Sequence, residues 1–268
     1  MSEELINKVL AEVVKKMGGD APAPSAAPAP APTPAAGALP AVTEFVGTNV
    51  LGDTIGMVIA NVDPKLRAMM KLEKDFRSIG ILGARTGAGP HIFAADEAVK
   101  ATNSEILTIE LPRDTKGGAG HGSLIIFGAE DVSDARRAVE VALGELDRTF
   151  GDVYGNDAGH LEFQYTARAS YALNKAFGAP IGKAFGITVG APAGIGVVLA
   201  DTAVKAATVD VIGYASPAGG TSYSNEVISF LSGDSGAVRQ AIIAAREVGI
   251  PLLGALGAKP ESTTTPYI

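Results

Sequence analysis

The sequence predicts an α/β protein, an α+β sandwich made of two tandem copies of one module. Three observations predict this: a pattern of residues recurs along the chain, strand-like and helix-like segments follow the same order in each copy, and a stretch of alanine and proline precedes both copies. We expect an amphipathic helix at 1–19, an Ala/Pro-rich linker at 20–43, a first module at 44–152 and a second module at 153–268.

The N-terminal segment has the spacing of a short amphipathic helix. Its apolar stripe includes Leu5, Ile6, Val9, Leu10 and Val13. The linker after it cannot form a hydrogen-bonded core, and its composition predicts an extended, semi-rigid spacer. Because a helix held away from the body cannot bury its apolar stripe there, we expect it to bind a partner. The alternative is a frayed arm surrounded by solvent.

The internal repeat is carried by two ordered blocks. The segment Ala95–Ala101 returns 105 residues later as Ala200–Ala206. Further along, a second block returns after 103 residues; its members are Ile125, Phe127, Arg136 and Ala138, matched by Ile228, Phe230, Arg239 and Ala241. Two blocks with nearly the same spacing indicate duplication of a whole module.

Each copy contains the same predicted elements. In the first copy we expect strands at 55–62, 78–83, 105–111 and 123–128, and helices at 64–73, 90–102 and 131–146. In the second copy we expect strands at 160–168, 184–189, 209–215 and 225–231, and helices at 170–177, 195–207 and 234–248. Four strands with helices per copy predict helices on one face of a mostly antiparallel sheet.

Composition excludes several classes of function. With no cysteine, the chain has neither disulfides nor thiolate metal sites. A net charge of −7 argues against nucleic acid as a partner, and no run of about 20 apolar residues predicts a membrane span. The three histidines, His91, His121 and His160, lack metal-ligand spacing and are expected to be polar surface groups. We expect no metal and no cofactor.

One segment looks catalytic. Gly233–Gly236 resembles the segment around a protease serine, but Asp234 and Ser235 stand where a helix begins, and oxygen atoms there cap backbone N–H groups. The equivalent place in the first copy keeps Asp131 and has Val132 in place of the serine. We therefore expect helix caps, and no enzyme.

Three glycine-rich loops are open to more than one interpretation. The loop 83–89 follows a strand and precedes a helix, so it is either a plain turn or an anion-binding nest of N–H groups. The loops 112–122 and 216–224 occupy equivalent places in the two copies. They are either ordinary hairpin loops or the lining of a narrow hole, where glycine lets backbones approach closely.

The second copy closely resembles the bacterial microcompartment shell domain. The resemblance rests on four segments: Phe185–Val189, Leu199–Ala207, Val209–Tyr214 and Ser232–Val238. The first copy matches more loosely and lacks the glycines at 130–135. A strand and short helix precede the usual first strand in both copies, which resembles the circularly permuted tandem subclass. The blocks 72–74, 77–91 and 110–122 are similar to shell proteins of propanediol-utilising compartments.

The resemblance implies a structural role in a compartment shell within the cytoplasm. It implies a homotrimer with a pseudo-hexagonal outline that packs beside other shell proteins, with Lys100 and Lys205 at the edges of each unit. It implies passage or binding of small diols or glycerol, for which the candidate residues are Glu110, Arg113, Asp114, Ser222 and Asn225. The N-terminal helix would anchor lumenal enzymes. The alternatives are a soluble oligomeric small-molecule-binding regulator and, third, an enzyme.

Overall fold

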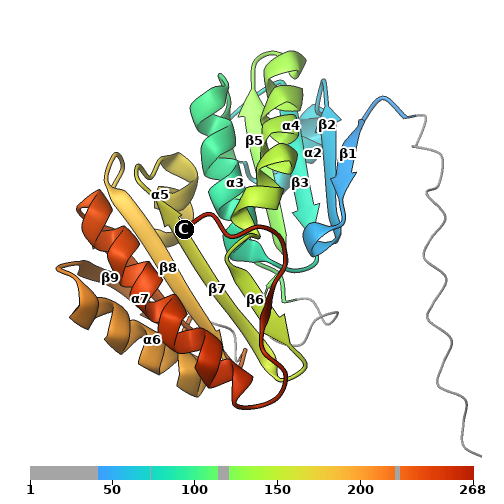
Figure 1. The fold of residues 1–268 in the computed structure, drawn as a ribbon. Coiled ribbons are helices and arrows are strands. Elements are labelled where there is room, and N and C mark those ends of the chain that lie inside the picture. The colour runs from blue at the N-terminus through green and yellow to red at the C-terminus, as the bar shows by residue number, and fades with distance from the viewer. Residues whose placement is uncertain (1–41, 73, 114–120, 221–223) are drawn as a thin grey trace, which may run out of the picture. The chain divides into compact units, whose positions relative to one another are not determined.

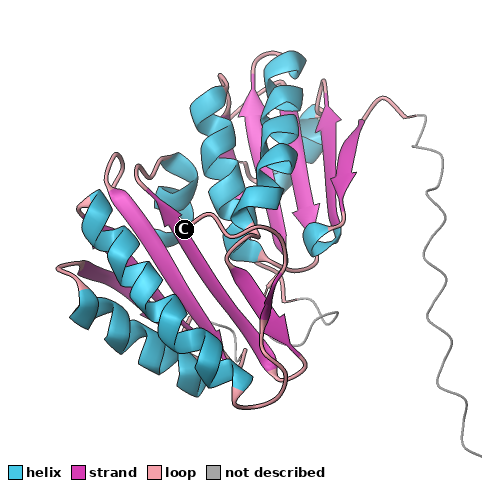
Figure 2. Ribbon diagram, viewed as in Figure 1, coloured by secondary structure: helices cyan, strands magenta, loops and turns pink. Residues whose placement is uncertain are grey.

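The computed structural model describes residues 42–72, 74–113, 121–220 and 224–268. Within them the chain forms two antiparallel sheets, each with helices packed on it (Figures 1 and 2). The predicted N-terminal helix and most of the predicted linker lie outside the described residues. The α/β class and the tandem arrangement are confirmed.

The first half of the body carries a five-stranded sheet with the strand order β1-β2-β3-β5-β4. Its elements are β1 (Phe45–Asn49), the short helix η1 (Leu51–Asp53), β2 (Thr54–Ile59), α2 (Pro64–Met70), β3 (Ser78–Ala84), α3 (Ala88–Ala101), β4 (Glu105–Glu110), β5 (Ser123–Ala129) and α4 (Val132–Thr149). We call these elements the first half.

The second half carries a six-stranded sheet with the strand order β11-β6-β7-β8-β10-β9. Its elements are β6 (Val153–Asn156), β7 (Gly159–Thr166), α5 (Tyr171–Phe177), β8 (Ala184–Ala191), α6 (Ala193–Ala206), β9 (Asp210–Ala215), β10 (Val227–Gly233), α7 (Ser235–Gly254) and β11 (Glu261–Ser262). From β6 to α7 the order repeats that of the first half from β1 to α4, apart from η1, which has no counterpart. The repeat read from the sequence is therefore a repeat of structure. The domain boundaries at 152 and 153 stay a prediction.

Local signals explain the short helices α2 and α5. Both have seven residues, and both end at a residue in the left-handed conformation, Lys71 after α2 and Gly178 after α5. Helix α2 begins with proline, and the carboxylate of Asp63 accepts hydrogen bonds from the N–H groups of Lys65 and Leu66. The two helices therefore match residue for residue.

The largest apolar core is shared by both halves. It includes Phe93 of α3, Ile106 of β4, Leu173 of α5 and Phe185 of β8. Phe93 and Phe185 are stacked with ring centroids 5.9 Å apart. Because the same buried cluster joins residues from the two sheets, the halves pack as one body and bury their joint surface from water.

The structure corrects the expected number of strands, the end of one helix and the expected helix caps. Strands β1, β6 and β11 were missed, because segments of two to five residues are too short for apolar alternation to be a clear signal. Helix α7 runs to Gly254 with Pro251 inside it. Asp131 and Asp234 do occupy the N-cap positions of α4 and α7, but neither side chain makes the expected capping hydrogen bond.

Among the described residues, no helix combines the length and the apolar character needed to cross a bilayer.

Candidate functional site: the junction between halves and its cavity

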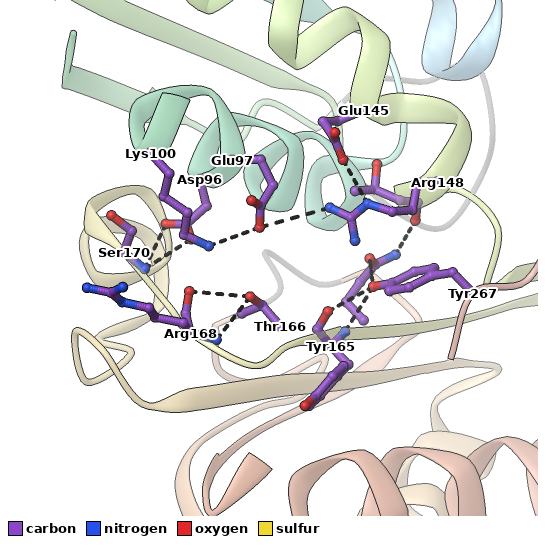
Figure 3. A network of polar contacts seen from close by, with 12 residues as sticks. Asp96, Glu97, Lys100, Glu145, Arg148, Tyr165, Thr166, Arg168, Ser170 and Tyr267 are labelled. Carbon is purple, nitrogen blue, oxygen red and sulfur yellow. Dashed lines mark hydrogen bonds and ion pairs between the residues drawn. The ribbon is translucent and has the colours of Figure 1, made fainter. Parts of the chain in front are cut away.

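The junction is the contact between α3 of the first half and α5 of the second half. Asp96 of α3 lies in it and is 1% exposed. Its carboxylate accepts hydrogen bonds from the N–H of Ser170 at 3.0 and 3.1 Å and from the N–H of Leu173 at 3.2 Å. Lys100, one turn further along α3, holds the same carboxylate at 2.9 Å (Figure 3). Asp96 therefore caps α5 across the junction.

The pKa of Asp96 reflects two opposed effects. Burial raises the pKa, while Lys100 and the N–H groups of Leu173 and Ser170 oppose that rise. The carboxylate is thus held by charge and hydrogen bonds in a site where an unpaired charge would be costly.

The two predicted edge lysines have different surroundings. The Lys100 side chain is 25% exposed and is engaged by Asp96 and Glu97. The Lys205 side chain is 72% exposed and pairs with Asp201 at 2.7 Å. The structure thus places Lys100 beside the second half of its own chain and Lys205 at an open surface. Their role at the edges of shell units stays a prediction.

Equivalent residues also differ in burial. Ile92 and Phe93 of α3 are 0% and 2% exposed. Their repeat counterparts on α6, Val197 and Val198, are 50% and 41% exposed. On the neighbouring edge strand, Val211 of β9 is 54% exposed, while its counterpart Ile106 is 8% exposed. The second half thus presents an apolar surface on α6 and β9 that the first half buries.

The C-terminal residues that follow β11 form a second set of contacts, with Asp152 after α4, with Arg148 of α4 and with Arg246 of α7. Asp152, which is fully buried, accepts hydrogen bonds from the N–H groups of Tyr267 and Ile268 at 2.8 and 3.0 Å. Arg246 of α7 reaches Asp152 at 2.5 Å and the carbonyl oxygen of Ile268 at 2.8 Å. Arg148, at the end of α4, lies over the ring of Tyr267 at 4.9 Å from its centroid (Figure 3).

A cavity of about 420 Å³ lies between residues of both halves. Its apolar wall includes Phe177, Ile187 and Phe230. Its polar wall includes His121, Glu162 and Glu226, together with the backbone around glycines such as Gly89 and Gly220. A volume of this size with few polar groups on an apolar wall is typical of sites for small molecules.

The polar wall is part of a cluster of ionisable side chains that we call the carboxylate cluster: Glu162, Glu226, His121 and His160. The Nε2 atom of His160 lies 3.6 Å from a carboxylate oxygen of Glu162 and 3.6 Å from one of Glu226. The Nε2 atom of His121 lies 3.5 Å from the other oxygen of Glu226. No hydrogen-bond partner within the described chain reaches Glu226 Oε1 or His160 Nε2. Polar groups of this kind are satisfied by water or by a ligand.

Burial sets the protonation of this cluster. It raises the pKa of Glu162 to about 8, with a further contribution from the neighbouring Glu226. Burial also raises the pKa of Glu226, against the lowering effect of His121 and Arg113. Burial lowers the pKa of His160 to about 4. Near neutral pH the cluster therefore combines a protonated Glu162 that can donate a hydrogen bond with a neutral His160.

The predicted ligand residues are partly near this cavity. Arg113 is close enough to Glu226 to lower its pKa, and Glu110 is exposed at the end of β4, next to the lining residue Leu111. Asn225 is exposed, and its side-chain oxygen accepts a hydrogen bond from the N–H of Ala193 at 3.2 Å. Asp114 and Ser222 lie outside the described residues.

Sequence reasoning missed the carboxylate cluster and misjudged the histidines. His91 is fully buried and bonds Thr54 Oγ1 and the Gly87 carbonyl oxygen, each at 2.6 Å, so the expectation of a surface group was wrong. The sequence does contain one signal for the carboxylate cluster. His160 and Glu162 are two residues apart on one strand, which places them on the same face of the sheet.

The anion-nest interpretation of the loop 83–89 is not supported. The N–H groups of Arg85 and Thr86 donate to the carbonyl oxygen of Gly52, and that of Ala88 donates to His121. These donors are satisfied inside the protein, so the loop is a structural turn. Within the described ranges, no group of three or more His, Cys, Asp or Glu side chains is arranged to hold a metal ion.

Comparison with known proteins identifies the family to which this fold belongs. The BMC domain model matches residues 78–156 and 184–257. The chain is 63% identical over its full length to the bacterial microcompartment shell protein PduB of Citrobacter freundii, covering 99% of that protein. It is 64% identical to PduB of Salmonella typhimurium, again over 100% of this chain and 99% of that protein.

Solved structures agree with this assignment. The crystal structure of a trimeric bacterial microcompartment shell protein PduB matches 85% of this chain and 100% of its own, with 55% identity and a TM-score of 0.83. EtuB from Clostridium kluyveri matches the same share of each chain with 58% identity and a TM-score of 0.82. The repeat, the fold and the full-length similarity lead to one conclusion: this chain belongs to the BMC-domain family of bacterial microcompartment shell proteins, in the group of PduB.

Proposed function

We propose that this chain is a structural unit of a microcompartment shell, without catalytic activity, and that three copies close a ring in which first and second halves alternate. The observation that carries the proposal is the difference in burial between α3 and α6. The apolar residues Ile92 and Phe93 of α3 are buried in the core shared with the second half of the same chain, whereas their counterparts on α6, Val197 and Val198, are exposed. Apolar surface of this kind gains free energy when it is buried.

The repeat identifies what would cover this surface. Within the chain, α3 and β4 of the first half meet α5 of the second half. Their counterparts α6 and β9 would meet α2 of the first half of another copy by the same geometry. This contact joins unlike surfaces, so it closes into a ring when the rotation per step divides a full turn. Trimeric PduB supports a ring of three chains.

The receiving helix has the surface that the proposal needs. Helix α2 has no buried residue, and two apolar side chains on it, Leu66 and Met69, are 49% and 79% exposed. On the matching helix α5, Leu173, the counterpart of Leu66, is fully buried in the shared core, and Ala176, the counterpart of Met69, packs against that core. Both partners of the proposed contact thus expose apolar residues at positions that are buried or partly buried in the contact within the chain.

Val198→Glu tests the ring. A charge in this surface should prevent burial, so sedimentation equilibrium should show monomers where the wild type is a trimer. Leu256→Glu is the matched control, because Leu256 is similarly exposed but lies beyond the end of α7. A trimeric Val198→Glu protein would contradict the proposed contact.

Electron microscopy tests the role in a shell. Trimers with a near-sixfold outline should form layers, tubes or hexagonal arrays, because many weak edge contacts add up in a flat layer. We place Lys205 at these edges, since its long side chain is exposed and can lie along a neighbour. Lys205→Ala should reduce arrays at protomer concentrations at which the variant is still a trimer. A discrete oligomer that never forms arrays would favour a soluble small-molecule-binding regulator.

We also propose that the cavity and the loops beside it bind or pass small diols or glycerol. The support is the pairing of an apolar wall with the carboxylate cluster, where Glu162 can donate and Glu226 can accept hydrogen bonds. The ligand would contact three residues near the cavity as it enters: Glu110, Arg113 and Asn225.

Crystals soaked in glycerol test this proposal. Density should lie beside Glu226, and Glu226→Ala should remove it while leaving the crystal form unchanged. Leu111→Ala keeps the polar groups and serves as the control. Density found solely at the outer rim of the molecule would count against the proposal.

The N-terminal segment is proposed to anchor lumenal enzymes through its apolar stripe at Leu5, Ile6, Val9, Leu10 and Val13. Deleting residues 1–20 should leave arrays intact and release enzymes from purified compartments. Unchanged retention of the enzymes would remove this proposal.

A further inference from the structure

We infer that Asp201 of one copy faces Asp63 of the next copy in the ring, so that each junction between copies opposes two carboxylates where the junction within the chain has a helix cap. This inference rests on the proposed ring. The contact of Asp96 with α5 within the chain serves as the template for the proposed contact of Asp201 with α2 of the next copy.

The contact within the chain is complementary in charge. Asp96 presents a carboxylate to the N-terminal end of α5, where the N–H groups of Ser170 and Leu173 point outward to it. Ser170, the N-cap residue of α5, makes no capping hydrogen bond with its own side chain. The first half therefore supplies the cap that α5 lacks.

The matching contact would use Asp201 and α2. Asp201 occupies the repeat position of Asp96, and its side chain is 57% exposed within the single chain. Helices α2 and α5 match from N-cap to C-cap, so Asp63 stands for Ser170 and Leu66 for Leu173. Repeating the geometry brings the Asp201 carboxylate to the N-terminal end of α2.

That end of α2 is already capped. The Asp63 carboxylate accepts hydrogen bonds from the N–H of Lys65 at 2.9 Å and of Leu66 at 3.0 Å. Pro64 contributes no N–H at all. The N–H of Leu66 is thus taken, so Asp201 meets the Asp63 carboxylate where Asp96 meets the N–H of Leu173. The counterpart of the other donor, the Ser170 N–H, is the N–H of Asp63 itself, directly beside that carboxylate. Like charges in a partly desolvated contact repel each other, so this contact is weaker than its counterpart within the chain.

Neighbouring charges moderate the repulsion without removing it. On α6, Lys205 pairs with Asp201. On α2, Lys65 is exposed beside Asp63, and Arg67 is held by Asp75 at 2.5 Å. The junction between copies is thus an acidic contact that neutralising one carboxylate strengthens, whereas neutralising Asp96 removes its ion pair with Lys100 and weakens the cap of α5.

Asp201→Asn is the primary test. We expect its trimer to dissociate with a constant about two- to fivefold lower than that of the wild type at pH 7.5, as measured by sedimentation equilibrium, because a partly exposed charge pair contributes little more than this. Asp63→Asn should act in the same direction, since asparagine still caps a helix. Asp96→Asn is the matched variant within the chain and should lower the midpoint of thermal unfolding.

A second measurement separates this inference from the ring itself. The chain has no cysteine, so Leu66→Cys with Val198→Cys introduces one thiol on each surface. A short bis-maleimide should join three chains covalently if the proposed surfaces meet. Covalent trimers together with an unchanged or weaker Asp201→Asn trimer would overturn the opposed carboxylates alone. Absence of covalent trimers would overturn the ring.

Discussion

Glu162 makes the stability of this protein depend on pH, and Glu162→Gln should remove its part of that dependence. The folded protein favours the protonated carboxyl, with a pKa raised from an ordinary value of 4.5 to about 8. Between these two values the unfolded chain has lost the proton and the folded chain has kept it. The free energy of unfolding therefore falls as the pH rises from 4.5 to about 8, and then levels off.

The magnitude follows from the displacement of the pKa. Each pKa unit corresponds to about 1.4 kcal/mol, so the rise from 4.5 to about 8 sets an upper limit of about 5 kcal/mol. Glu226 shares the site, and the pair can keep one proton between them while one carboxyl ionises. We therefore expect about 2–3 kcal/mol at pH 9, which corresponds to a rise of about 4–8 °C in Tm for Glu162→Gln.

Thermal unfolding at fixed protomer concentration between pH 4.5 and 9 is the assay. Glutamine has the shape of the protonated carboxyl, so the two proteins should agree at pH 4.5 and separate as the pH rises. Glu140→Gln, on the exposed surface of α4, is the matched control and should follow the wild type throughout. Equal Tm values of the wild type and Glu162→Gln at pH 9 would refute the reasoning.

Three further substitutions probe packing. Phe93→Ala removes the ring stacked on Phe185 in the shared core and should cost about 3–5 kcal/mol in the free energy of unfolding. Gly87→Ala forces a side chain into a backbone with φ of 81° and a Cβ position 2.3 Å from the ring of Phe150, and it should cost about 1–3 kcal/mol. Asp152→Ala leaves the partly buried Arg246 guanidinium without its carboxylate and the N–H groups of Tyr267 and Ile268 without an acceptor, and should cost about 3–5 kcal/mol. Urea denaturation measures all three, with Val50→Ala, at a side chain 91% exposed, as the control expected to change little. A loss below about 1 kcal/mol for any of the three would contradict its assigned role.

The repeat made most of the fold predictable. Blocks such as Ala95–Ala101 and Ala200–Ala206 showed that both halves have the same order of elements. The long helices and the apolar strands could then be predicted from the spacing of their apolar residues. Strands as short as β6 and β11 escaped because their pairing depends on neighbours far away in sequence, such as Ser262 opposite Tyr154. Pairing of this kind leaves little trace in local periodicity.

The site was less predictable for a related reason. The carboxylate cluster joins His121 of the first half to Glu162 and Glu226 of the second, and only the packing of the halves brings them together. The same holds for Asp96, whose pattern with Lys100 is identical to that of Asp201 with Lys205. Their surroundings differ because one helix meets its own chain and the other does not.

Because the module is duplicated within one chain, its two copies can carry different residues at equivalent positions. By strand pairing and loop position, the counterparts of Glu162 and Glu226 in the first half are Ile55 and Gly122, an aliphatic side chain and a glycine. A ring assembled from six identical domains would have to repeat a buried acid at every sector or at none. In the proposed ring alternate sectors differ, so the cost of burying ionisable side chains falls on three of the six domains and not on the other three.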